Sequence, residues 1–384
     1  MITLIKDTVS NEDIDNLSDW LKTYPRLTKG PMTTQFESKF SDWEGVNHSV
    51  MVNSGSSANL LMLYTLKVMG KMKNDKVVVP GLTWATDLAP VIQLGMEPLL
   101  CDCNLTNLSV DIGDLERIFE EHEPSVLILV SILGFSPNMD AITALCNTHG
   151  VILLEDVCES LGTTYKGKKL GTFGLMSSYS FYFGHHASTI EGGMVCTNDE
   201  EVYKVLLSIR SHGWNRDWSI EDRESIEEQY GIDNINAMYT FYYPGFNLRA
   251  TDLQAFIGLE QMPRFDDGIL ARYNNFNTYN NLIQNPYWMP SAIPDSMTSN
   301  FAYPLIHPKK DVIVNILWNN DIETRPLVCG SMGTQPFYTN LYGELRLENC
   351  DIVSDYGIYL PNHPALNYSE IEKVCEVINK VIGE

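Results

Sequence analysis

The hydrophobic and polar positions of the chain fall into two kinds of segment that alternate along its first half. Short runs such as VLILV and VILLE are almost wholly apolar, which is typical of strands covered on both faces in a parallel sheet. Between them lie longer segments with apolar residues at helical spacing. This alternation predicts an α/β fold in which right-handed crossovers join parallel strands.

The predicted strands of the first half share a short apolar core and cover residues 48–53, 77–80, 98–102, 125–130 and 151–155. The predicted helices around them cover residues 11–24, 33–44, 60–69, 85–95, 112–121 and 139–149. Beyond residue 240 the pattern predicts helices up to about residue 283, strands near 301–307 and 324–328, and helices at 312–319 and 368–382. A chain of 384 residues exceeds the usual size of one domain, so we expect a large domain over residues 1–245 and a smaller C-terminal α/β domain over residues 246–384.

Composition restricts the partners of the chain. A net charge of −23 argues against nucleic acid or an anionic membrane, although backbone amides and a few arginines can still bind a phosphate locally. The first residues show no signal-peptide pattern, and no apolar run has membrane-spanning length. The acidic residues 217–236 are expected to form a solvated surface insertion.

The eight cysteines are scattered, which suits free thiols in a reducing cytoplasm, and we expect the protein to be cytoplasmic. Cys101 and Cys103 are the only close pair, and alternate faces of one strand explain them better than a metal does. We therefore expect no metal site.

Polar residues at the predicted strand ends suggest a cofactor site. The SGSSAN turn, residues 54–59, joins a strand to a helix and offers free backbone N–H groups, although a plain serine-capped helix has the same pattern. Trp84 offers a flat face on which an aromatic ring can stack. Asp156 follows an apolar strand, where a carboxylate needs a cationic partner such as a pyridinium N–H⁺, although a helix cap or a structural salt bridge is the alternative. Together these residues favour a pyridoxal-type cofactor, whose protonated ring is an electron sink.

Residues 177–193 read SSYSFYFGHHASTIEGG and deliver His185 and His186 from a strand to a turn that ends in Gly-Gly. This segment resembles the loop that carries the cofactor lysine in the DegT/DnrJ/EryC1/StrS family of sugar aminotransferases, where the pattern is roughly Lys-x-x-(Thr/Ser)-(Thr/x)-x-Glu-Gly-Gly. His185 stands six residues before Glu191, in the place of that lysine. The blocks VNSGSSANLL, PGLTW, LLEDVCES, GTFG, GFNLRATDLQAFIGLEQ and RPLVCG are also similar to family blocks and follow the same order.

The resemblance implies the fold type I architecture of pyridoxal-phosphate enzymes, with a mostly parallel seven-stranded sheet and a smaller C-terminal domain. It implies roles for residues that contact the cofactor: phosphate binding by Gly55, Ser56 and Ser180, ring stacking by Trp84, pairing with the ring nitrogen by Asp156, and a weaker positioning role for Glu159. Asn247 would reach the phosphate bound by a neighbouring subunit, so a homodimer with shared active sites is expected.

The missing lysine changes the expected reaction. Imidazole forms no lasting Schiff base, so pyridoxamine phosphate would be bound non-covalently, while His185 can still accept and donate a proton. The resemblance then implies a sugar 3-dehydratase that removes the C3 hydroxyl of a nucleotide-linked 4-keto-6-deoxy hexose, with GDP-4-keto-6-deoxy-D-mannose favoured and glutamate as amino donor. His186 is the second candidate for the base.

Candidates for binding the anionic groups of substrate or glutamate are His212, Arg216 and Arg249, because guanidinium groups suit carboxylate and phosphate. His212 alone could equally be a structural loop histidine, and Arg216 could pair with the acidic insertion. Two other functions stay open: a 4-keto-sugar aminotransferase, and a catalytically silent sugar- or cofactor-binding protein. An iron–sulfur variant of the dehydratase is disfavoured, because the later cysteines lie far apart in the sequence.

Overall fold

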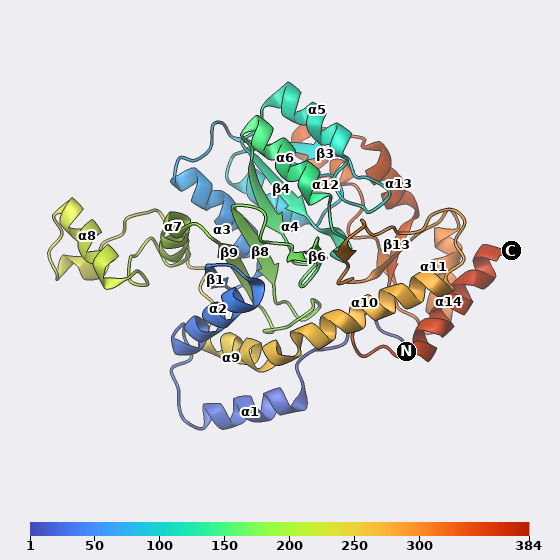
Figure 1. The fold of residues 1–384 in the computed structure, drawn as a ribbon, viewed down its shortest axis with the longest axis horizontal. Helices are drawn as coiled ribbons and strands as arrows, with labels where there is room; N and C mark the ends of the chain where they lie inside the picture. Colours follow the sequence, from blue (N-terminus) through green and yellow to red (C-terminus); the bar gives the residue numbers. More distant parts are fainter. Residues whose placement is uncertain (384) are drawn as a thin grey trace.

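The computed structural model describes residues 1–383, and its centre is a seven-stranded sheet of strand order β1-β9-β8-β5-β4-β2-β3 (Figure 1). Its strands are β1 (His48–Val52), β2 (Lys76–Pro80), β3 (Glu97–Cys101), β4 (Val126–Val130), β5 (Ile152–Asp156), β8 (Met176–Ser180) and β9 (Gly193–Thr197). Neighbouring strands from β8 to β3 pair in parallel, whereas β9 runs antiparallel to both β1 and β8. The predicted α/β fold with a mostly parallel sheet is confirmed.

Strand β4 shows why the apolar runs form central strands. All of its residues are buried, and alternate side chains point to opposite faces of the sheet. Val126 and Ile128 join one apolar cluster with residues of α3 (Gly55–Val68), α4 (Ala85–Gln93) and α7 (Glu200–Arg210). Leu127 and Leu129 join a second cluster with residues of α2 (Pro31–Glu44), α5 (Ile112–His122) and α6 (Met139–His149). Helices therefore cover both faces, as a doubly apolar strand requires.

A small antiparallel sheet follows later in the chain, with strand order β11-β13-β12. It consists of β11 (Tyr303–Ile306), β12 (Arg325–Pro326) and β13 (Gly357–Leu360), and nearby helices are α10 (Phe265–Leu282), α11 (Lys310–Asn319), α12 (Pro336–Tyr342), α13 (Glu348–Tyr356) and α14 (Tyr368–Gly383). The predicted helices at 312–319 and 368–382 are confirmed, and the two predicted strands are shorter than expected. The sequence pattern did not predict β13, α12 or α13.

Helix α9 (Asp252–Gln261) packs against α2 and α1 (Asn11–Leu21), beside the large sheet. Asp252 accepts hydrogen bonds from the N–H groups of Gly30 (2.7 Å) and Thr33 (3.0 Å), so it caps a helix whose own N-cap residue has no side chain. Helix α10 then leads from the large sheet to the small one (Figure 1). The domain boundary at residue 245 stays a prediction, and α9, which follows it, lies with the large sheet.

Pro31 begins α2, whereas the predicted helix started at residue 33. Proline is well tolerated in the first helical turn, because the N–H group that it lacks has no helical partner there. None of the helices within residues 1–383 is long and apolar enough to cross a membrane.

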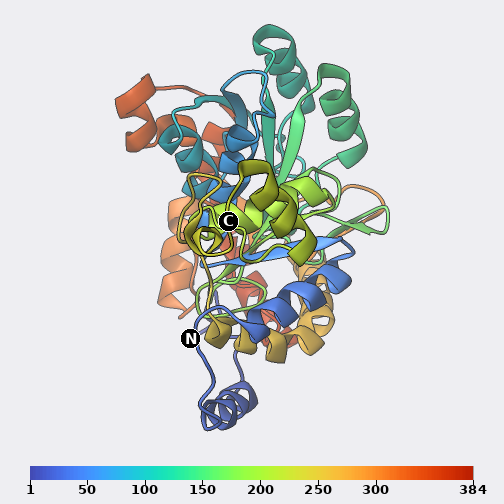
Figure 2. The same cartoon turned by 90° about the vertical axis from the view of Figure 1, so that its left-hand side faces the viewer.

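The acidic insertion forms α8 (Ile220–Tyr230), which has no buried residue and projects from the body of the molecule in Figure 1, so that it lies in front of the body in Figure 2. The prediction of a solvated insertion holds for α8. Asp217, at the start of the insertion, is an exception to this prediction, because its carboxylate lies 2.9 Å from Arg210 Nη2 and 3.0 Å from Lys29 Nζ. These ion pairs lower the pKa of Asp217, although burial of the carboxyl opposes them as the largest single effect. Asp217 therefore anchors the insertion to the large sheet.

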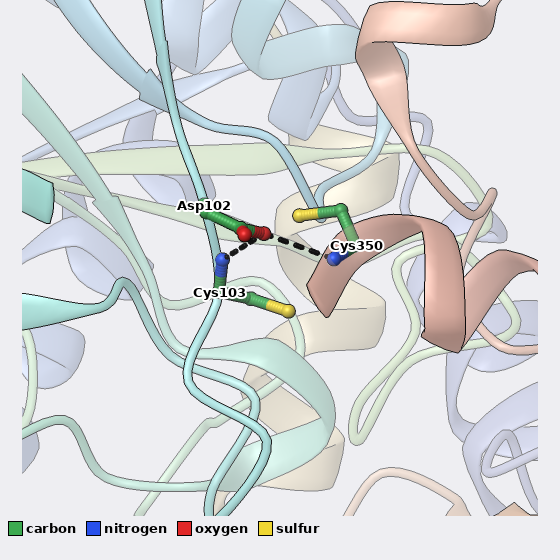
Figure 3. Close-up of side chains that lie close together, drawn as sticks. All are labelled: Asp102, Cys103 and Cys350. Atoms are coloured by element: carbon green, nitrogen blue, oxygen red, sulfur yellow. Dashed lines mark hydrogen bonds between the residues drawn. The ribbon is translucent and has the colours of Figure 1, made fainter. Parts of the chain in front are cut away.

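The loop after β3 contacts helix α13 through Asp102. β3 ends at Cys101, so Cys103 does not lie on the same strand, contrary to prediction. Figure 3 shows the Asp102 carboxylate between the backbone N–H groups of Cys103 and Cys350, which donate to it at 2.8 and 2.9 Å, and Asn349 N–H donates to it at 3.0 Å. Asn349 and Cys350 form the first turn of α13, whose N-cap residue makes no side-chain cap. Asp102 thus caps α13 from the other part of the molecule, which accounts for its position beside the two thiols.

Candidate active site

A cavity of about 420 Å³, the expected cofactor cavity, lies at the carboxyl ends of the parallel strands, where such sheets bind their ligands. Its walls come from the seven-stranded sheet, from the small β11-β13-β12 sheet and from the loop after β8. The lining residues are Ile5, Ser54, Gly55, Ser56, Trp84, Thr86, Asp87, Val130, Ile132, Asp156, Cys158, Glu159, Ser180, Tyr182, Gly184, His185, Glu191, Phe301, Arg325 and Tyr359. The structure therefore brings together seven of the predicted site residues: Gly55, Ser56, Trp84, Asp156, Glu159, Ser180 and His185.

The N-terminus of α3 opens into this cavity. Ser54 caps the helix by accepting the Ser57 N–H at 3.1 Å, whereas the N–H groups of Gly55 and Ser56 have no hydrogen-bond partner among the described residues. A Cβ on Gly55 would lie 2.7 Å from the Cβ of Ser180, so only glycine allows this approach. Free N–H groups, nearby hydroxyls and a positive helix end together fit a phosphate dianion.

Asp156, the last residue of β5, is only 3% exposed and has no Lys or Arg partner among the described residues. Its oxygens accept hydrogen bonds from Asn59 Nδ2 at 2.6 Å and from the Cys158 N–H at 2.8 Å. Asn59 also donates to Asp87 at 2.9 Å, and burial, aided by the Asp156 carboxylate, raises the pKa of Asp87 well above its usual range. Asp87 therefore keeps its proton, while Asp156 remains a buried acceptor without a cation, which fits a pyridinium N–H⁺. The alternative of a structural salt bridge is not what the structure shows.

Trp84 stands at the N-cap of α4 and is 55% exposed in the cavity wall. A large aromatic side chain is normally more buried than this. The exposed indole is thus available for stacking on a planar ligand.

The loop that carries His185 is fixed at both ends. Phe181 is fully buried, and its carbonyl accepts the Thr189 N–H at 2.8 Å. At the exit, a Cβ on Gly193 would lie 2.4 Å from the Ser54 carbonyl oxygen, so this glycine allows β9 to pass beside the start of α3. The Gly-Gly ending therefore brings the loop close to the expected phosphate position.

The two adjacent histidines face different cavities. His185 lines the cofactor cavity, with its ring centroid 5.4 Å from that of Phe301, and its buried Nδ1 has no hydrogen-bond partner among the described residues. Burial lowers the pKa of His185 to about 4, although the nearby Asp156 carboxylate opposes this shift. His186 Nε2 donates to the Ser299 carbonyl at 3.1 Å and lines a separate cavity of about 360 Å³. Of the two, only His185 is positioned to reach a ligand in the cofactor cavity.

Glu159 lies beside Asp156 in the cavity wall and accepts the Leu133 N–H at 2.8 Å. Burial and the neighbouring Asp156 raise the pKa of Glu159 to about 7, against the effect of that hydrogen bond. Near neutral pH this carboxyl can therefore either donate or accept a hydrogen bond.

The other predicted residues lie outside this cavity. Arg216 and Arg249 line a further cavity of about 260 Å³, together with Arg26 and Lys29. Asn247 accepts a hydrogen bond from Arg249 Nε at 3.1 Å. The guanidinium of Arg216 stacks 3.8 Å from the centroid of the Trp214 ring and donates to the Met238 carbonyl, so it does not pair with carboxylates of the acidic insertion.

His212 packs against the Trp214 ring at 5.2 Å between centroids. Its backbone is left-handed, with φ of 64°, which is uncommon for a residue with a side chain. Within one chain, therefore, the predicted substrate residues and Asn247 do not join the cofactor site.

Sequence reasoning missed several lining or supporting residues. Asn59 stands within the SGSSAN motif, and Asp87 follows Trp84 by one helical turn, so both lay close to recognised positions. Arg325 begins the RPLVCG block, but no periodicity placed it near the large sheet. Only the fold brings Arg325 and Tyr359, paired across β12 and β13, to the cavity.

Fold and sequence define the class of the protein. It belongs to the DegT/DnrJ/EryC1/StrS aminotransferase family, whose sequence model matches residues 7–379, and it has the fold of pyridoxal-phosphate-dependent aminotransferases. The chain is 32% identical over 367 residues to GDP-4-keto-6-deoxy-D-mannose 3-dehydratase of Yersinia pseudotuberculosis, covering 92% of each protein. It is 26% identical to the GDP-perosamine synthase of Vibrio cholerae, covering 98% of each.

Solved structures of similar proteins have the same fold. The E. coli GDP-4-keto-6-deoxy-D-mannose-3-dehydratase with bound hydrated PLP is 28% identical, with a TM-score of 0.89 over 98% of this chain and 99% of that one. A further structure of a GDP-4-keto-6-deoxymannose-3-dehydratase, with a trapped PLP-glutamate geminal diamine, also has a TM-score of 0.89 over 98% of this chain and 100% of that one.

Proposed function

We propose that the protein is a pyridoxamine-phosphate-dependent 3-dehydratase. It removes the C3 hydroxyl of a nucleotide-linked 4-keto-6-deoxy hexose, with GDP-4-keto-6-deoxy-D-mannose as the favoured substrate and glutamate as the amino donor. The observation that carries this proposal is His185, an imidazole that lines the cofactor cavity where the family pattern has lysine. The names of similar proteins support the same reaction.

The residues of the cavity fit the cofactor. Gly55, Ser56 and Ser180 would hold its phosphate, Asp156 would pair with its ring nitrogen, and Trp84 would stack on the ring. When bound, the cofactor supplies an amine that condenses with the sugar ketone and a ring that accepts electrons. Glu159, with its pKa near neutrality, lies beside Asp156, where a positioning role suits it.

His185 would move the proton. Because its pKa is lowered, its imidazole is neutral at neutral pH and can accept a proton at a ring nitrogen. The imidazolium so formed can pass that proton to the C3 hydroxyl as it leaves, so one residue acts first as base and then as acid. Unlike lysine, this side chain cannot bind the cofactor covalently, and elimination replaces amino transfer.

We infer a homodimer with shared sites. The cofactor cavity has several carboxyls in its wall but a single guanidinium, which is too little positive charge for a cofactor phosphate together with a nucleotide diphosphate. The cavity that holds Arg26, Lys29, Arg216 and Arg249 supplies such charge on the surface of the same chain. In the proposed dimer this second cavity, with Asn247, faces the cofactor cavity of the other subunit.

The eight free cysteines suit a cytoplasmic location.

A second candidate is a 4-keto-sugar aminotransferase, because the similar proteins include GDP-perosamine synthases. The test is product analysis by mass spectrometry after incubation with GDP-4-keto-6-deoxy-D-mannose, glutamate and pyridoxal phosphate. A 3-deoxy ketone with one oxygen fewer than the substrate, formed together with ammonia and 2-oxoglutarate, is expected. An amino sugar as the product would overturn the proposal in favour of the aminotransferase, and no turnover would favour the silent binding protein.

A further inference from the structure

The wall of the cofactor cavity contains several carboxyl groups and a single guanidinium group. Asp87, Asp156, Glu159 and Glu191 all line it, and Arg325 is the only lysine or arginine among the lining residues. Within one chain, a ligand that brings a carboxylate into this cavity therefore meets one cationic partner.

Arg325 is held in place and is still free to bind. It lies on β12, where its backbone pairs with Tyr359 of β13, and it reaches the cavity from the small sheet. Its guanidinium lies near the Tyr359 hydroxyl, whose pKa is raised chiefly by burial, with Arg325 acting against that shift. None of the ion pairs within residues 1–383 includes Arg325, although other arginines of the chain do pair with carboxylates. An unpaired guanidinium in a wall of carboxyls is suited to a carboxylate from a ligand.

The other demands of the reaction are met by other groups. The start of α3 suits the cofactor phosphate, Asp156 suits the ring nitrogen, and His185 suits proton transfer. The sugar substrate carries no carboxylate, whereas glutamate carries two and must bring its amino group to the same cofactor carbon. A donor carboxylate that entered the cavity without a cationic partner would lose its hydration without compensation.

We propose that Arg325 binds a carboxylate of the amino donor and so determines the specificity of the half-reaction that regenerates pyridoxamine phosphate, not of the dehydration. This rests on the proposed function. In that half-reaction the amino group and two electrons pass from glutamate to the cofactor aldehyde, and 2-oxoglutarate is released. The proton from the glutamate α-carbon moves through His185, and no other reductant is needed.

The test separates the two half-reactions in the holoenzyme. Arg325→Gln, loaded with pyridoxal phosphate, is mixed with glutamate, and the loss of aldehyde absorbance and the release of 2-oxoglutarate are followed. We expect kcat/KM for glutamate to fall about 10- to 100-fold, the usual loss of a charged hydrogen-bonded pair, with partial recovery in Arg325→Lys. Glutarate, a dicarboxylate without an amino group, should bind the wild-type holoenzyme in calorimetry and bind Arg325→Gln more weakly by a similar factor.

The second arm loads the same variants with pyridoxamine phosphate and measures a single turnover of GDP-4-keto-6-deoxy-D-mannose. The rate should stay within about twofold of the wild-type rate, which also shows that the variant is folded. Arg346→Gln is the matched control, because Arg346 is exposed, pairs with Glu344 and Asp351, and lies outside the cofactor cavity. It should change neither half-reaction.

The outcomes are distinct. A loss confined to the sugar half-reaction would assign Arg325 to the nucleotide diphosphate and overturn the inference, as would unchanged glutamate kinetics and glutarate binding. If Arg325→Gln does not fold, a raised KM for glutamate in Arg325→Lys, with sugar turnover unchanged, supports the inference, and an unchanged KM refutes it. Wild-type enzyme that consumes glutamate but never dehydrates the sugar would instead refute the proposed function and leave the donor site standing.

Discussion

A shift of one position along the chain decides which of His185 and His186 can reach a ligand in the cofactor cavity. They are neighbours in sequence, yet His185 lines the cofactor cavity, while His186 hydrogen-bonds to Ser299 and lines another cavity. The sequence placed a histidine in the lysine position of the family pattern but left open which of the two is the base. Side-chain direction in a loop depends on tertiary contacts, here with Phe301 and Ser299, that no local pattern encodes.

Replacing His185 by asparagine should therefore abolish most turnover. Asparagine keeps a polar side chain but cannot accept a proton and pass it on to the leaving hydroxyl, so we expect kcat to fall about 10²- to 10⁴-fold, the usual contribution of a general base. Steady-state assays with GDP-4-keto-6-deoxy-D-mannose measure this loss. His186→Asn is the control and should lose much less. Equal losses in both variants would contradict the assignment of the base.

Glu159 makes a separate prediction about pH. Its pKa rises from 4.5 to about 7 in the folded protein, so between these values the folded chain keeps a proton that the unfolded chain has lost. The stability contributed by this carboxyl is complete below pH 4.5 and is lost as the pH rises through 7, by about 3 kcal/mol in total. Glu159→Gln lacks this titration. The difference between its unfolding free energy and that of the wild type should therefore rise by about 3 kcal/mol, in favour of the variant, from pH 4.5 to 7.5.

Denaturant unfolding of cofactor-free protein at several pH values measures this difference. Glu376→Gln, at an exposed position on α14, is the control and should follow the wild type at every pH. Parallel curves for Glu159→Gln and wild type would mean that Glu159 is ionised in the folded protein throughout this range.

At the level of elements, the hydrophobic pattern predicted strands best where both faces of the strand are buried. Strand β4 is apolar on both faces, β5 is apolar up to its last two residues, and both could be predicted within one residue, whereas β12 is shorter than predicted and β13 was missed. A strand of two residues such as β12 is too short for periodicity to set its bounds, which follow from its pairing with β13. The same limit hid Arg325, while Gly55, Trp84 and Asp156 could be found because each stands at the end of a readable strand or at the start of a readable helix.

The cap that Asp102 provides for α13 is a second contact that local patterns could not reveal, because the helix and its cap are 245 or more residues apart. Asp102→Ala removes the acceptor of three backbone N–H groups, and we expect the unfolding free energy to fall by about 2–3 kcal/mol. Urea unfolding measures this change. Asp19→Ala removes an exposed pair with Lys22 and should change stability by about 0.5 kcal/mol at most. If both variants lose the same amount, Asp102 is not a cap of consequence.

At the level of the whole molecule, the distribution of charge over two cavities is the feature that a single chain does not explain. One cavity combines the cofactor-binding elements with an acidic wall, and the other holds Arg26, Lys29, Arg216 and Arg249. A two-fold dimer in which these cavities face each other would complete both sites at once. The resemblance to the family predicted this sharing through Asn247, and it remains a prediction here.

Complementation between inactive chains tests the sharing. His185→Asn and Asn247→Asp should each be inactive as homodimers, the first for lack of a base and the second because a carboxylate repels the cofactor phosphate. The two chains carry different tags, are coexpressed, and the hybrid dimer is purified. This hybrid has one site with both substitutions and one site with neither. Activity should therefore return. Activity that stays absent in a purified hybrid dimer would show that each site is built from one chain.

The central claim is that an imidazole replaces the amine that would bind the cofactor covalently. The most direct measurement is the intact mass of the protein after incubation with stoichiometric pyridoxal phosphate, borohydride reduction and denaturation, with His185→Lys as the positive control. The expected result is the mass of the unmodified chain for the wild type and one added phosphopyridoxyl group for His185→Lys. A wild-type chain that carries the phosphopyridoxyl group would contradict it.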